Sequence, residues 1–267
     1  MMQIRPPAVA GVFYPIDPAE LNRDVSAMLV AASGAPDAAP PKALIVPHAG
    51  YVYSGRIAAT GYSRIVALRR RVRRVVLLGP AHRVAVRGLA LPAVQAFATP
   101  LGPVLLDTEA MRSVAALPQV RVNDAAHAGE HSIEVHLPFL QVALGRFRLV
   151  PFVVGDASAE EVAEALDRLW GGEETLIVVS SDLSHYLPYA RACAKDEFTV
   201  RTILLLNREL DHEQACGATP INGLLLSSRS RSLVPRLLDL RNSGDTAGDK
   251  SRVVGYAALA FHEPLPA

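Results

Sequence analysis

The sequence contains few cysteines and little net charge, and both features narrow its possible functions. Two cysteines, Cys193 and Cys216, occur in 267 residues, which is too few for a disulfide framework and indicates a reducing compartment. We therefore expect a cytoplasmic protein. The formal net charge is +1, so the overall basic excess typical of nucleic-acid binding is missing. A basic run at residues 69–74 is interpreted as a solvated helix end rather than a binding patch.

Long apolar runs and nucleotide-binding loops are also missing. The longest apolar stretches, such as residues 75–80 and 149–154, have the length of strands and fall far short of a bilayer span. The first eleven residues lack the pattern of a signal peptide. Neither G-x-G-x-x-G nor G-x-x-x-x-G-K-[ST] occurs. We therefore expect no membrane association and no nucleotide cofactor.

Hydrophobic residues make up 50% of the chain, enough for a substantial core. Short β-rich runs alternate with amphipathic segments, which predicts one α/β domain over residues 1–267. Its mixed, largely parallel sheet would carry helices on both faces, as three α/β/α layers. Residues 31–41 are interpreted as a linker too short to separate two domains. Strands are expected at 43–46, 74–78, 88–91, 147–154, 175–180, 233–240 and 253–261. Helices are expected at 18–32, 54–68, 108–116, after 130, and at 159–170, 188–207 and 220–228.

Two of the expected strands are each followed by a histidine. His48 comes after the run 43–46, and His82 comes after the run 75–78 and a Gly-Pro turn. One such histidine is more often a hydrogen-bonded loop residue than a ligand. Because ligands bind at the carboxyl ends of strands in open α/β sheets, the repeated arrangement favours a functional site there.

A third strand, 175–180, leads to Asp182 and His185. Asp182 is equally compatible with a helix N-cap and with a role in orienting a histidine. His185 is the better candidate for proton transfer, because imidazole titrates near neutral pH.

Residues 127–138 hold three histidines and two glutamates, an unusual density. Glu130 and Glu134 are four residues apart and are expected on one helix face, with His136 pointing elsewhere. The spacing does not match the H-E-x-x-H motif of zinc peptidases. We include Glu130, His131, Glu134 and His136 as pocket candidates, with a solvated structural helix as the alternative.

Cys216 lies just before an expected helix with Thr219 as N-cap, where unpaired amide groups stabilise a thiolate. Cys193, between two alanines of an expected helix, is interpreted as an inert buried residue. Tyr51, Tyr53 and Tyr186 are candidates for an aromatic pocket wall, with core packing an equal alternative.

Six motifs together resemble those of the Memo family, whose microbial members are often labelled protein B of the AmmeMemoRadiSam system. They are RPPAVAGVFYP at 5–15, PHAGYVYSG at 47–55, GPAH at 79–82, EHSIEVHLPFL at 130–140, SSDLSHY at 180–186 and CGATPI at 216–221. The resemblance implies a fold similar to the class III extradiol ring-cleaving dioxygenases (LigB-like). It implies His48, His82 and Cys216 as metal ligands, with Asp182 and His185 as catalytic residues lining the same pocket. A radical-SAM protein and an AMMECR-type protein are the implied partners.

The implied thiolate departs from the two histidines and carboxylate of the ring-cleaving enzymes, so their reaction does not transfer with the fold. Fe(II) is the expected metal, with Cu or Zn as alternatives. The leading hypothesis is a metal-dependent oxidoreductase acting on a small molecule or peptide. A metal-dependent hydrolase and a non-catalytic protein that binds peptides or handles metal remain alternatives.

Overall fold

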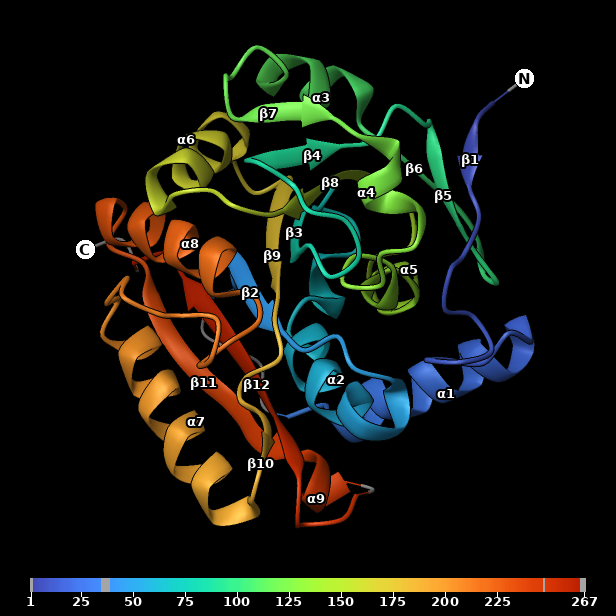
Figure 1. Ribbon diagram of the computed structural model, residues 1–267. Helices are drawn as coiled ribbons and strands as arrows, with labels where there is room; N and C mark the ends of the chain where they lie inside the picture. The colour runs from blue at the N-terminus through green and yellow to red at the C-terminus, as the bar shows by residue number, and fades with distance from the viewer. Residues whose placement is uncertain (1, 35–38, 247, 265–267) are drawn as a thin grey trace.

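A mixed β-sheet forms the centre of the protein, as the computed structural model shows for residues 2–34, 39–246 and 248–264 (Figure 1). The main path of the sheet runs β10-β12-β2-β9-β3-β8-β4-β7, and β11 pairs with the free side of β12. The bounds are β10 (His185–Leu187), β12 (Val253–His262), β2 (Ala43–Val46), β9 (Thr175–Ser180), β3 (Arg74–Pro80), β8 (Arg148–Val154), β4 (Leu89–Leu91), β7 (Val120–Val122) and β11 (Val234–Asn242). A small second sheet joins β1 (Ile4–Arg5), β5 (Ala96–Thr99) and β6 (Gly102–Leu105).

Four parallel strands, β2, β9, β3 and β8, form the middle of this sheet. Their residues are nearly all apolar and fully buried, as expected for strands covered on both faces. Val46 pairs with Ser180, and Leu78 pairs with Val179. The carboxyl ends of β2, β9 and β3 therefore lie together at one edge of the sheet.

Helices cover both faces of the sheet (Figure 1). On one face α1 (Pro18–Ala31), α2 (Arg56–Ser63) and α5 (Leu137–Leu144) pack together. On the other face α6 (Ala159–Leu169) packs on α8 (Ala218–Ser230), and α7 (Tyr189–Leu204) packs against β11 and β12. The shorter helices are α3 (Thr108–Val114), α4 (Asp124–Ala128) and α9 (Ser243–Thr246). The side chains of Asp17 and Ser158 accept hydrogen bonds from the first turns of α1 and α6, which explains where these helices begin.

The predicted mixed α/β class with helices on both faces is confirmed, and β2 and β9 have the predicted bounds. The helix expected over 54–68 is divided into a π-helical turn (Tyr51–Gly55), α2 and a 3-10 turn (Val66–Leu68). At Gly55 a β-carbon would lie 3.0 Å from Met28 Sδ and 3.2 Å from Tyr51 Cβ, so this turn packs closely on α1.

The strands missing from the sequence prediction are β1, β5, β6, β7 and β10, none longer than four residues. Segments this short show little periodicity, and pairing with distant strands decides their conformation. Residues 35–38, in the middle of the expected linker, lie outside the described residues. Within the described ranges, no helix is long and apolar enough to cross a membrane.

Candidate metal centre

His48 and His82 follow the carboxyl ends of β2 and β3, and their rings approach to 5.1 Å between centroids. The two strands are not adjacent in the sheet, because β9 lies between them. β9 ends in Ser180, which therefore lies beside the site. Three adjacent strand ends thus contribute to one cluster of polar side chains.

A third imidazole, that of His131, completes the cluster. Its ring stacks on His82 with centroids 4.7 Å apart and meets the edge of His48 at 5.4 Å. One ligand nitrogen from each of His48, His82 and His131 lies within 4.8 Å of the other two. The sequence indicated His131 only as a pocket residue, because the loop that carries it has no regular periodicity.

Ser180 determines which nitrogen of His48 carries the lone pair. The Ser180 hydroxyl donates to the Ser132 carbonyl at 2.6 Å, so its oxygen accepts from His48 Nδ1 at 2.6 Å and from His136 Nε2 at 2.8 Å. Tyr62 donates to the other His136 nitrogen at 2.8 Å. Complete burial and the neighbouring histidines hold the pKa of His48 well below its usual value. His48 is therefore neutral, with a free lone pair on Nε2.

Glu130 orients His82 in a similar way. Its carboxylate accepts hydrogen bonds from His82 Nδ1 at 2.9 Å and from the backbone amides of His82, His131 and Ser132. Burial would raise the pKa of Glu130, but the hydrogen bonds from His82 and Ser132 outweigh it and lower the pKa to about 2. The ionised carboxylate keeps the proton on His82 Nδ1 and leaves Nε2 free, as carboxylates do beside metal-binding histidines.

The Nδ1 atom of His131 is buried without a hydrogen-bond partner. It lies 3.3 Å from Glu130 Oε1, but the geometry is not that of a hydrogen bond. Burial lowers the pKa of His131 to about 4, so this imidazole is also neutral. Three clustered imidazoles, of which His48 and His131 are neutral and His82 is oriented by Glu130, suit a transition-metal ion.

Cys216 lies beside this cluster, with its sulfur 3.5 Å from His48 Nε2. Two ligands on one tetrahedral metal, with bonds of about 2.0 and 2.3 Å, would be about 3.5 Å apart. The sulfur also accepts from the Asp182 amide at 3.3 Å. We expected Cys216 to be a thiolate, but burial and the nearby Asp182 raise the pKa of its thiol to about 12. Without a bound cation the thiol is therefore protonated. Helix α8 begins at Ala218, and Thr219 is not its cap.

Asp182 and His185 occupy different positions around the cluster. Asp182 is buried, and its carboxyl accepts the His48 amide at 2.8 Å, which holds the backbone at the end of β2. Burial raises the pKa of Asp182 to about 7. His185 lies on β10 and lines a cavity of about 420 Å³ together with His82 and Cys216. Partial burial lowers the pKa of His185, so its ring is neutral at pH 7.

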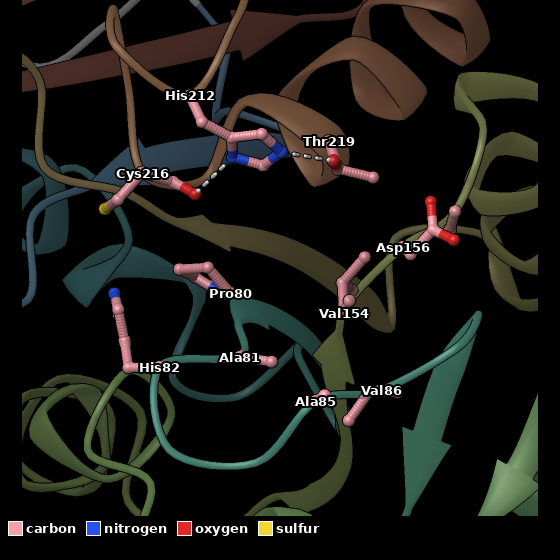
Figure 2. A pocket seen from close by; sticks show the side chains of 12 residues that line it. Pro80, Ala81, His82, Ala85, Val86, Val154, Asp156, His212, Cys216 and Thr219 are labelled. Carbon is pink, nitrogen blue, oxygen red and sulfur yellow. Dashed lines mark hydrogen bonds between the residues drawn. The ribbon is translucent and has the colours of Figure 1, made fainter.

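A larger cavity of about 610 Å³ adjoins the cluster, and His82 and Cys216 lie at one end of it (Figure 2). Its other walls are mostly apolar, from the loops after β3 and β8. His212, which no sequence motif indicated, lines both cavities and contacts the Cys216 carbonyl and Thr219 Oγ1, each at 3.3 Å. The only sequence feature that could have indicated His212 as a cavity residue was its position four residues before Cys216.

Three proposed pocket residues instead belong to the core. Tyr51 is buried, with its hydroxyl donating to the Val135 carbonyl at 2.8 Å. His136 is fully buried between Tyr62 and Ser180. Glu134 is fully buried and pairs with Arg5 at 2.6 Å. These polar groups are satisfied within the protein, so none of the three is available to a ligand.

Glu130 and Glu134 do not share a helix face, because residues 130–133 are not helical and a 3-10 turn begins only at Glu134. Tyr53 and Tyr186 are partly exposed, at 43% and 61%. Tyr186 has a φ of 57°, and the Arg252 guanidinium lies 5.2 Å from its ring centroid. Neither tyrosine lines either of the two cavities beside the cluster.

Residues 5–260 match the family model described as "Memo-like protein". A "MEMO1 family protein" of Aquifex aeolicus is 38% identical over 97% of this chain and 100% of the relative. Another, from Ignicoccus hospitalis, is 37% identical over 99% of this chain and 100% of the relative. A solved structure of an uncharacterized Escherichia coli K12 protein has a TM-score of 0.48 and 16% identity, covering 81% of this chain and 98% of that one.

Proposed function

Since this chain belongs to the Memo-like protein family, we propose that it is a metal-dependent oxidoreductase whose ion is held by His48, His82 and His131. The Cys216 sulfur is a fourth donor. The observation that carries the proposal is the tautomer of His48, because the bond to Ser180 leaves a lone pair on the nitrogen that faces Cys216. A metal ion would accept that lone pair and lower the pKa of the thiol.

Fe(II) is the metal we propose, with Cu as the alternative within the same function, because imidazole and thiolate together suit both. Bound Fe(II) would supply electron transfer and open coordination positions for a substrate and dioxygen. The two cavities that His82 and Cys216 line would hold the substrate, which we propose is a small molecule or a short peptide. From the family resemblance, a radical-SAM protein and an AMMECR-type protein remain proposed partners.

His185 and Asp182 have separate roles in this proposal. The neutral ring of His185 lines the cavity of about 420 Å³ and would accept a proton from a substrate hydroxyl. Asp182 is buried and accepts the His48 amide, so it acts as a positioning residue. Glu130 holds His82 in the tautomer that binds metal.

A metal-dependent hydrolase is a second candidate, favoured by one observation. Three imidazoles without a carboxylate ligand are also the ligand set of some catalytic zinc sites, in which bound water is activated. Under this alternative Cys216 would stay protonated, and turnover would not depend on oxygen.

The two functions are distinguished by the metal content of protein purified without oxygen. We expect stoichiometric iron in the wild type, little metal in His48→Ala and His131→Ala, and unchanged iron in the Cys193→Ala control. Zinc alone under every preparation, with oxygen-independent hydrolysis of an ester or phosphate panel, would overturn the oxidoreductase in favour of the hydrolase.

A further inference from the structure

A third cavity, of about 530 Å³, lies at the opposite end of the central strands from the histidines. Arg74 and Arg148 are paired at the beginnings of the parallel strands β3 and β8, whereas His82 follows the end of β3. The seven residues of β3 span roughly 20 Å at about 3.3 Å per residue. This cavity is therefore separate from the two beside the histidine cluster.

Arg73, Arg146 and Arg148 line this cavity, which we call the arginine cavity, and no acidic side chain lines it. Among the described residues Arg73 and Arg146 have no side-chain hydrogen bond or ion pair, and Arg148 has one long bond of 3.4 Å to the Leu106 carbonyl. The nearby Asp107 is already paired with Arg74 at 2.8 Å. Three arginines with few side-chain partners thus line one cavity in a protein whose net charge is only +1, and the carboxylate with which Arg148 interacts electrostatically is Asp107.

The rest of the lining is mainly apolar. It includes Phe147 and Leu105, which is 40% exposed, and the Gln141 amide adds a polar group. The volume lies within the range of small-molecule sites. Guanidinium groups bind phosphate oxygens through paired N–H donors, and apolar surface favours a hydrocarbon portion beside the charge.

We propose that the arginine cavity binds a small phosphate monoester, with the phosphate between Arg73, Arg146 and Arg148 and an apolar chain against Leu105 and Phe147. A phosphate dianion suits this cavity better than a carboxylate, because it carries two charges and three terminal oxygens for three guanidinium groups. The site does not depend on the metal centre or on the proposed oxidoreductase function.

Isothermal titration of the full chain with hexyl phosphate tests the proposal. We expect saturable 1:1 binding that persists after chelation of metal and weakens with added salt. Inorganic phosphate should bind more weakly than hexyl phosphate, because it lacks the apolar chain. Hexanoate should also bind more weakly than hexyl phosphate, because it carries one negative charge fewer. Arg73→Gln and Arg146→Gln should each weaken hexyl phosphate binding roughly tenfold, since each removes charge-assisted hydrogen bonds.

Arg191→Gln is the matched control, since it makes the same change on the exposed face of α7, which packs on β11 and β12. It should leave binding unchanged. Unfolding midpoints of all three variants should stay near that of the wild type, because the substituted side chains are exposed. Absence of saturable heat with hexyl phosphate, equal weakening by Arg191→Gln, or hexanoate binding as tightly as hexyl phosphate would each overturn the proposal.

Discussion

The Ser180 hydroxyl oxygen lies 2.6 Å from His48 Nδ1, and this contact decides which nitrogen of the imidazole faces the Cys216 sulfur. The Ser180 hydroxyl oxygen can accept a hydrogen bond from His48 Nδ1 because the hydroxyl donates its own hydrogen to the Ser132 carbonyl. The relationship arises because β9 is inserted between β2 and β3. A serine at the end of the middle strand therefore orients a histidine that follows its neighbour.

Replacing Ser180 with alanine should weaken metal binding by roughly 10–100-fold, as for other residues that orient metal-binding histidines. The substitution also leaves buried N–H groups of His48 and His136 without an acceptor, at about 1–3 kcal/mol each. Competition titration with a chromophoric chelator measures the affinity, and urea unfolding measures the stability. Ser228→Ala is the control, because the Ser228 hydroxyl is buried without a hydrogen-bond partner. An unchanged affinity in Ser180→Ala would contradict the assigned tautomer.

Cobalt substitution tests whether Cys216 binds the metal. We expect Co(II)-loaded protein to show a near-ultraviolet absorption band from sulfur-to-cobalt charge transfer, because the Cys216 sulfur is 3.5 Å from His48 Nε2. The band should disappear in Cys216→Ala and persist in Cys193→Ala, which removes the other free cysteine. Survival of the band in Cys216→Ala would exclude this thiol as the ligand.

Glu134→Ala should lower the free energy of unfolding by about 3–5 kcal/mol, because it leaves the buried Arg5 guanidinium without its carboxylate. Glu134 also accepts hydrogen bonds from Tyr14 and from the amides of residues 8 and 9, so it anchors the amino-terminal segment. Metal affinity should change much less than in Ser180→Ala. Urea unfolding beside the exposed Glu109→Ala control measures the effect, and a loss below 1 kcal/mol would refute the anchoring role.

Asp196 should make stability depend on pH. Burial, partly offset by the hydrogen bond from the Ser184 amide, raises the pKa of Asp196 from 3.8 to about 6. The folded state therefore holds this proton more tightly than the unfolded state. The contribution to stability is greatest below about pH 3.8 and is lost as the pH rises to about 6, a difference of about 3 kcal/mol.

Asp196→Asn cannot ionise, so it should gain stability relative to the wild type across this pH window. Unfolding free energies of both proteins at a series of pH values between about 4 and 7 measure the difference. Parallel curves for the two proteins would show that the Asp196 carboxyl does not titrate in this range.

Much of the architecture could be predicted from local patterns. The apolar β-branched runs at Ala43–Val46 and Thr175–Ser180 form the predicted strands, because such residues suit strands buried on both faces. His48 and His82 lie where they were expected, because parallel strands bring their carboxyl ends to one edge. The motifs identified the family without knowledge of the side-chain geometry.

Other features were decided only when distant segments packed together. The order of the strands placed Ser180 beside His48, 132 positions away in the chain. Glu130 and Glu134 have the same chemistry in the sequence, yet Glu130 turned toward His82 and Glu134 toward Arg5, because a non-helical loop separates them. The same non-helical loop carries His131 and places its ring beside His48 and His82. Local composition determines which segments become strands, whereas the hydrogen-bond partner of each buried polar group depends on which strands become neighbours.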